Sequence, residues 1–155
     1  MAAAAQTLAP ARKRKSAKGL FANSPLAFLD LGEPEQVIER TRKGLPAQTI
    51  DFVAGLLALS RSALLDIVKI PLSTAERRLR TGESLTAEES DRVIRVAKTL
   101  RRAVEVFGDA GQAKAWMTDS VSSLGGRSPL SLLDTMEGYD LVANTLARIE
   151  YGVYG

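Results

Sequence analysis

The stretch "PLSTAERRLRTG" (residues 71–82) decides how the rest of this chain is interpreted. It places three arginines within four positions, at Arg77, Arg78 and Arg80. Ser73 and Glu76 have the spacing of a capping box, which predicts a helix that begins at Thr74. Gly82 is a residue that commonly ends a helix. The stretch therefore predicts a short helix with a strongly basic surface.

The two faces of this helix differ in chemistry. Ala75 and Leu79 are four residues apart and share the face that we expect to pack inward, together with Leu72. The opposite face, with spacings i, i+3, i+4 and i+7, carries Thr74, Arg77, Arg78 and Thr81. Arginine can bind guanine through two hydrogen bonds, and threonine can contact base edges or phosphate. An exposed face of this kind is either simply hydrated or reads DNA.

The residues before this helix favour DNA binding. "SRSALLDIV" (60–68) predicts a short helix, and "KIPL" (69–72) predicts a turn because its proline cannot continue a helix. Two short helices around a tight turn have the proportions of a helix-turn-helix, whose second helix enters the major groove. We expect this motif at about residues 60–82, with Arg61 and Lys69 suited to phosphate contacts. The candidate DNA-binding residues are Lys69, Ser73, Thr74, Arg77, Arg78 and Thr81.

The rest of the chain has helical periodicity, and no segment alternates with period two. The longest helix is predicted after a second capping box, Thr86 and Glu89. Its apolar stripe consists of Val93, Ala97, Leu100, Val104 and Phe107. Further helices are predicted from Asp109, and from Ser128 with Pro129 at the first helical position. Gly138 is expected to separate that helix from a last one. The predicted fold class is all-α.

Composition narrows the possible functions. The chain has neither cysteine nor histidine, so thiol chemistry, disulfides and the commonest general base are excluded. We expect no catalytic residue, no metal site and no cofactor. No run of about eighteen apolar residues is present, so we expect no membrane span. The N-terminus has no apolar core typical of a secretory signal, which favours a cytoplasmic protein.

Charge divides the chain into regions. Residues 1–19 contain five basic and no acidic residues, and we expect a disordered basic tail there. Residues 20–108 are predicted to be an all-α domain that contains the helix-turn-helix. Residues 109–155 contain three basic and six acidic residues and are predicted to form a second helical domain. This distribution suggests two kinds of partner rather than one.

The order of residues in two adjoining regions resembles one family of bacterial antitoxins. Trp116, "LGGRSPLSLL" (124–133) and "RIEYGVY" (148–154) are similar to the toxin-binding domain of the Xre/MbcA/ParS family. The stretch "LSTAERRLRTGESLTAEESDRVIRVA" (72–97) resembles the Xre-like helix-turn-helix of the same family. The resemblance covers roughly residues 33–155 and leaves out the basic tail.

This resemblance implies a type II antitoxin whose partner is a RES-domain toxin, an enzyme that depletes NAD. The antitoxin itself would catalyse nothing. It would form a homodimer, repress its own operon by binding operator DNA in the nucleoid, and cover the toxin's active site with its C-terminal end. Carried onto this sequence, the candidate toxin-binding residues are Arg148, Glu150, Tyr151, Tyr154 and Gly155.

Two other functions remain possible from the sequence. The first is a free-standing dimeric helix-turn-helix transcription regulator without a toxin partner, whose C-terminal region only dimerises. The second is an enzyme that uses the carboxylates of Glu88, Glu89 and Asp91. These acids lie in the first turn of the predicted long helix, where the helix dipole already favours negative charge, so a structural role is favoured for them.

Overall fold

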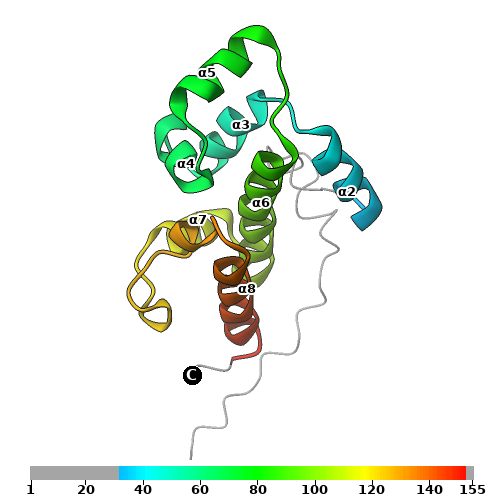
Figure 1. Ribbon diagram of the computed structural model, residues 1–155. Helices are drawn as coiled ribbons and strands as arrows, with labels where there is room; N and C mark the ends of the chain where they lie inside the picture. The colour runs from blue at the N-terminus through cyan, green and yellow to red at the C-terminus, as the bar shows by residue number, and fades with distance from the viewer. Residues whose placement is uncertain (1–31, 153–155) are drawn as a thin grey trace, which may run out of the picture. The chain divides into compact units, whose positions relative to one another are not determined.

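In residues 32–152, the part of the chain that the computed structural model describes, the regular secondary structure is helical, which confirms the predicted fold class (Figure 1). Within these residues no β-strand forms, and two isolated bridges occur between loops. The predicted basic tail, and Tyr154 and Gly155, lie outside the described residues. The α-helices are α2 (Pro34–Lys43), α3 (Gln48–Leu56), α4 (Arg61–Val68), α5 (Leu72–Thr81), α6 (Ala87–Phe107), α7 (Ala110–Thr118) and α8 (Met136–Glu150).

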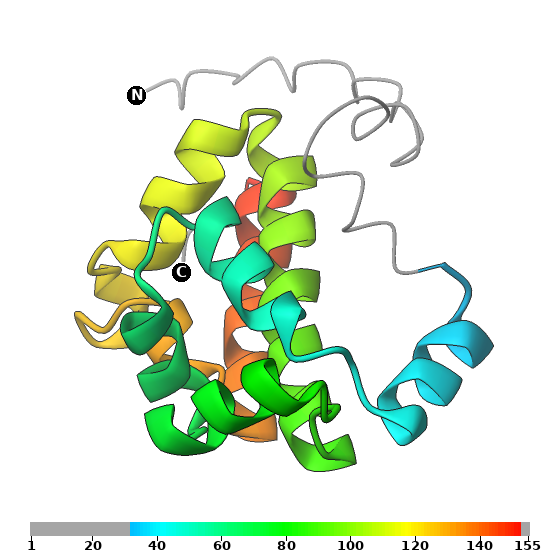
Figure 2. The same ribbon diagram turned by 90° about the horizontal axis from the view of Figure 1, so that it is seen from above.

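Helix α6 is the element around which the others pack. It is the longest helix and begins at the predicted capping box, in which the hydroxyl of Thr86 accepts the amide of Glu89 at 3.1 Å. Helices α2, α3 and α4 contact it, and so do α7 and α8 (Figures 1 and 2). Its apolar stripe is buried from Val93 to Val104. Beyond it, the ring of Phe107 lies 5.8 Å from that of Trp116.

The start of α5 differs from the prediction. The helix begins at Leu72 after Pro71, and no side chain caps it, so Ser73 is not the N-cap and the predicted capping box with Glu76 is absent. Pro71 has φ −60° and ψ 139°, the extended conformation of an N-cap residue, and its ring fixes that φ. Because the helix starts two residues early, Leu72 lies in its first turn and is exposed instead of packing inward.

The segment before α8 also differs from the prediction. Leu130–Leu132 forms a short 3-10 helix, and Gly138 lies inside α8 instead of separating two helices. Thr135 caps α8 by accepting the amide of Gly138 at 3.0 Å. A Cβ atom at Gly138 would overlap the carbonyl oxygen of Leu132, so the glycine allows the 3-10 helix to approach the first turn of α8.

Neither a membrane-spanning helix nor a cluster of metal-binding side chains is found within residues 32–152. No helix there is long and apolar enough to cross a membrane. The same residues contain no cluster of three or more acidic side chains arranged to hold a metal ion.

Candidate functional site

Helices α4 and α5 form the predicted pair of short helices joined by a tight turn. The hydroxyl of Ser60 caps α4 by accepting the amide of Ala63 at 3.1 Å. Lys69, whose side chain is exposed, ends α4 in the left-handed conformation, with φ 56° and ψ 46°. The amide of Ile70 then donates to the carbonyl of Leu65 at 3.1 Å, which closes the turn. This geometry places α5 directly after α4, as a helix-turn-helix requires.

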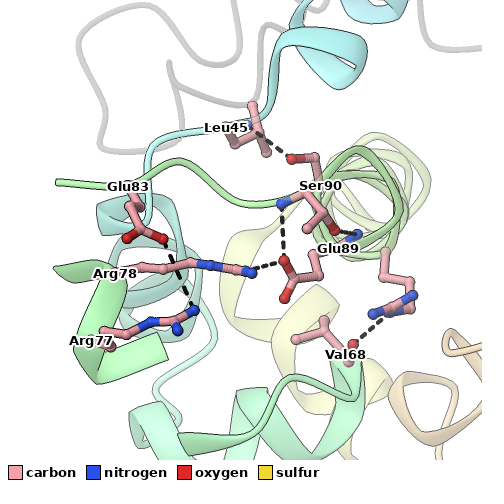
Figure 3. Close-up of polar contacts among 9 residues, drawn as sticks. Leu45, Val68, Arg77, Arg78, Glu83, Glu89 and Ser90 are labelled. Carbon is pink, nitrogen blue, oxygen red and sulfur yellow. Dashed lines mark hydrogen bonds and ion pairs between the residues drawn. The ribbon is translucent and has the colours of Figure 1, made fainter. Parts of the chain in front are cut away.

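The outer face of α5 presents most of the side chains predicted for it. Ser73, Arg77 and Thr81 are exposed, and Thr74 is half-buried. The Arg77 guanidinium lies 3.9 Å from the carboxylate of Glu83, and both side chains are more than half exposed (Figure 3). A contact of this length between hydrated side chains is weak. Arg77 is therefore available to an external partner.

Arg78 points the other way, so the prediction that it lies on the exposed face is wrong. Its side chain is 11% exposed and forms an ion pair with Glu89 of α6, whose side chain is 10% exposed (Figure 3). The physical reason lies in the helical spacing. Arg78 follows the buried Ala75 by three residues, so it lies at the edge of the inward face. A guanidinium in that position needs a buried counter-charge, which Glu89 supplies.

Glu89 joins the ion pair to the cap of α6. Besides Arg78, its carboxylate accepts the backbone amide of Thr86 at 2.9 Å. Burial by itself would raise the pKa of Glu89, but the hydrogen bonds from Thr86 and Arg78 outweigh it and leave the pKa below its ordinary value. Glu89 therefore stays ionised at neutral pH. Glu89 was one of the three acids considered above for catalysis, and these contacts give it a structural role instead.

Two more residues at the start of α6 hold neighbouring elements. The Ser90 hydroxyl accepts the amide of Leu45, in the loop between α2 and α3, at 2.9 Å. The Nε of Arg92 donates to the carbonyl of Val68, the last residue of α4, at 2.6 Å. A cation at the carboxyl end of a helix is favoured by the helix dipole. Sequence reasoning missed Arg92, because nothing in the local pattern connects it to a carbonyl 24 residues away.

Arg61, expected to suit a phosphate contact, is held within the protein. Its guanidinium forms two hydrogen bonds of 2.7 Å with the two carboxylate oxygens of Asp51 on α3. The hydrogen bond from Arg61 lowers the pKa of Asp51 from its ordinary value. This pair joins the start of α4 to α3, and the positive charge of Arg61 is largely neutralised by Asp51.

The predicted toxin-binding residues lie at the end of α8. Arg148 is exposed, and Tyr151, which follows the helix, is 66% exposed. Glu150 is 19% exposed at its side chain and forms an ion pair with Arg102 of α6. Of the three predicted residues in the described part of the chain, Arg148 and Tyr151 are thus presented at the surface, whereas Glu150 is turned toward α6.

Comparisons with known proteins agree with this arrangement. Residues 36–98 match the Antitoxin Xre-like helix-turn-helix domain, and residues 102–152 match the Antitoxin Xre/MbcA/ParS C-terminal toxin-binding domain. The two matched regions include α4 and α5 in the first and α7 and α8 in the second.

Three relatives cover most of the chain. An Antitoxin Xre of Yersinia enterocolitica is 32% identical over 119 residues, which are 76% of this chain and 80% of the relative. An Antitoxin Xre of Photorhabdus laumondii is 33% identical over 112 residues, 72% and 76% of the two chains. A Sphingobium protein named Prs ADP-ribosylating antitoxin is 26% identical over 141 residues, 84% and 89% of the two chains. The chain therefore belongs to the Xre family of antitoxins, with an Xre-like helix-turn-helix followed by a C-terminal toxin-binding domain.

Proposed function

We propose that this antitoxin neutralises a RES-domain toxin that consumes NAD, by covering the entrance to the toxin's active site with its C-terminal segment, residues 148–155. The observation that carries this proposal is the end of α8. It lies in the matched toxin-binding region, and it presents Arg148 and a largely exposed Tyr151 directly before the last residues of the chain. An aromatic side chain with a polar end suits an interface pocket.

The name of one relative supports a toxin that uses NAD. The name of the Sphingobium antitoxin refers to ADP-ribosylation, and ADP-ribosyl transfer takes its ADP-ribose from NAD. A toxin that simply hydrolyses NAD and one that transfers ADP-ribose to a protein share this substrate. The experiment below separates them by the fate of the ADP-ribose.

We propose that the helix-turn-helix represses the antitoxin's own operon as a homodimer. Helix α5 would enter the major groove, with Arg77 at base edges and Ser73, Thr74 and Thr81 beside it, while Lys69 contacts phosphate. Arg78 is paired with Glu89, so we do not propose it as a base contact. Helix α5 is short, so a single copy makes few base contacts. Two copies in a homodimer, bound to a palindromic operator, would supply the specificity that a single copy lacks. Such a protein would act in the cytoplasm, on the nucleoid when bound to the operator.

The proposal assigns no catalytic role and no cofactor to this chain. Two of the three acids considered at the start of α6 have structural explanations. Glu89 is in the capping box, and Asp91 lies 3.1 Å from the guanidinium of Arg95. Inhibition would thus arise from binding alone.

The test is capture of the full chain, tagged at its N-terminus, from its native cells, followed by identification of the co-purifying proteins. We expect one small protein in a fixed ratio, which consumes NAD once the antitoxin is stripped away. NAD labelled in its adenine ring shows whether ADP-ribose is released or attached to a protein. Capture of DNA without a stoichiometric protein would contradict the toxin partner and support a free-standing regulator.

A truncation tests the covering mechanism. Deletion of residues 151–155 is expected to weaken inhibition of the captured toxin by at least about tenfold, which is about 1.4 kcal/mol. Operator binding should be unchanged in the same protein, because the helix-turn-helix lies elsewhere in the fold. Full inhibition by the truncated chain would contradict the covering mechanism.

A further inference from the structure

We infer that Arg102 is a positioning residue for toxin inhibition. Its guanidinium holds the carboxylate of Glu150 and thereby fixes where α8 ends and where Tyr151 is presented. This inference rests on the proposed function of the C-terminal segment. It also gives Glu150 a different role from the one first predicted for it, because Glu150 acts within the antitoxin instead of contacting the toxin.

The geometry of the pair supports this role. The Arg102 guanidinium contacts both carboxylate oxygens of Glu150, Nη2 with Oε2 and Nη1 with Oε1, the latter at 3.5 Å. The two side chains are 34% and 19% exposed. Two-point contact between a planar guanidinium and a carboxylate fixes direction as well as distance. It therefore holds the end of α8 in one orientation against α6.

The position of Glu150 at the end of its helix explains why a nearby cation such as Arg102 is needed. Glu150 is the last residue of α8, where the helix dipole presents partial negative charge and disfavours a carboxylate. Partial burial adds a desolvation cost to the same group. Arg102 offsets both costs. Glu105, one turn further along α6, lies 3.5 Å from the Arg102 guanidinium and helps to orient it.

The last turn of α8 connects the ion pair to Tyr151. The amide of Tyr151 donates to the carbonyl of Ala147 at 3.0 Å, and the amide of Gly152 donates to that of Ile149 at 3.2 Å. Gly152 has φ 69°, so the chain turns at this point. If Glu150 lost its contact with Arg102, we expect this turn to open more readily and Tyr151 to be held less firmly. The pair is therefore placed to set the start of the covering segment.

The experiment compares four full-length proteins: the wild type, Arg102→Glu, Glu150→Arg and the double variant. Two properties are measured for each, the hydrogen exchange of the Tyr151 and Gly152 amides and the inhibition of the captured toxin's NAD consumption. We expect each single variant to exchange faster at both amides and to inhibit at least about tenfold more weakly. The double variant should regain both properties, because the exchanged charges can pair again and the helix dipole favours a cation at the carboxyl end of α8.

The reciprocal swap separates positioning from contact. If the double variant regains slow exchange but not inhibition, Arg102 or Glu150 contacts the toxin directly and the inference is wrong. If the single variants inhibit fully while deletion of residues 151–155 does not, the inference is wrong and the proposed function stands. If the deletion itself leaves inhibition intact, the proposed function fails and the inference fails with it.

Two controls accompany these variants. Arg42→Glu reverses the charge of a highly exposed arginine on α2, paired with Glu39 at 3.5 Å, and is expected to leave inhibition and exchange at Tyr151 unchanged. Operator binding and far-UV circular dichroism establish that each variant is folded. If either charge reversal prevents folding, Arg102→Gln removes the charge with less disturbance and should show the same loss of inhibition and faster exchange. Full inhibition by Arg102→Gln, with slow exchange, would overturn the inference.

Discussion

Arg77 and Arg78 are neighbours in the sequence, yet they have different surroundings and different expected roles. Arg77 is exposed on the outer face of α5, whereas Arg78 is largely buried against Glu89. Substitution of Arg77 should therefore weaken DNA binding with little effect on stability. Disruption of the ion pair between Arg78 and Glu89 should mainly lower the stability of the fold. Each of these expectations can be tested separately.

Arg77→Ala is expected to weaken operator binding by about 1–3 kcal/mol, the cost of losing one arginine contact to a base edge. Binding to unrelated DNA should weaken less, because phosphate contacts dominate that interaction. Inhibition of the toxin should be unchanged. The measurement is binding to operator and unrelated duplexes at one salt concentration. Equal losses on both duplexes would show that Arg77 contacts phosphate, and lost toxin inhibition would show that it supports the fold.

Glu89→Gln is expected to lower the free energy of unfolding by up to about 3–5 kcal/mol at pH 7, because it leaves the largely buried Arg78 without a counter-charge. Glutamine can still complete the capping box, so the substitution mainly removes the charge. Chemical denaturation of both proteins measures the difference. A change below about 0.5 kcal/mol, well under the loss expected for a broken buried pair, would show that the ion pair contributes little.

The same pair of proteins should reveal a dependence on pH. The pKa of Glu89 in the folded protein lies below its ordinary value of 4.5. The stabilising contribution of the Glu89 carboxylate is therefore fully present above the pKa that Glu89 has in the unfolded chain. The contribution is lost as the pH falls through the folded-state pKa. The stability difference between the wild type and Glu89→Gln should therefore be constant near neutral pH and decrease in acid. A difference independent of pH would contradict the role of the charge.

At this scale, the sequence predicts some properties and not others. Helical spacing correctly placed Ala75 inside and Arg77 outside. It did not place Arg78, because the deciding partner lies 11 residues away on another helix. Glu150 and Arg102 are 48 residues apart, so local pattern contains no information on their pairing. Partners of charged side chains depend on the packing of helices, which one sequence does not specify by its periodicity.

At the scale of elements, two helical glycines show how packing can override intrinsic helix preference. Gly55 in α3 has open space around the position of a Cβ atom, whereas at Gly138 in α8 such an atom would overlap the carbonyl of Leu132. Alanine is favoured over glycine in a helix by about 1 kcal/mol. The two sites should therefore respond to the same substitution with opposite signs.

We expect Gly55→Ala to stabilise the protein by about 0.5–1 kcal/mol through helix preference alone. Gly138→Ala should destabilise it, because the 3-10 helix Leu130–Leu132 must move away from the first turn of α8. Thermal unfolding of both variants at one protein concentration tests this contrast. A gain in stability at Gly138 would show that the 3-10 helix yields easily. A loss of stability in Gly55→Ala would show that a methyl group at this position meets an unexpected contact.

The helix boundaries show where sequence patterns succeed. The capping box at Thr86 and the cap at Asp109 were predicted correctly, because each has a matching residue three positions later and no competing signal nearby. The start of α5 was predicted wrongly because Pro71 lies just before a plausible but unused capping box. Gly138 misled the prediction for a different reason. The contact that requires glycine comes from outside its own helix.

At the scale of the whole molecule, α6 connects the two matched regions. The helix-turn-helix match ends at residue 98 and the toxin-binding match begins at residue 102, so both limits fall within α6. The start of this helix holds α4 and α5 through Arg92 and Glu89, and its later turns pack against α7 and α8. The helix-turn-helix and the toxin-binding region therefore share one long helix and one core.

A shared helix predicts a single cooperative unfolding transition for residues 32–152, which lie in one compact unit. The chain has one tryptophan, Trp116, whose fluorescence reports on the toxin-binding region, while far-UV circular dichroism reports on all helices. The two thermal curves should coincide at one fixed protein concentration. Leu100→Ala, in the middle of α6, should destabilise the protein by about 2–5 kcal/mol and shift both curves together, because Leu100 is fully buried. A Trp116 transition separate from the circular dichroism curve would mean that the toxin-binding region unfolds independently, and that α6 does not unite the two regions.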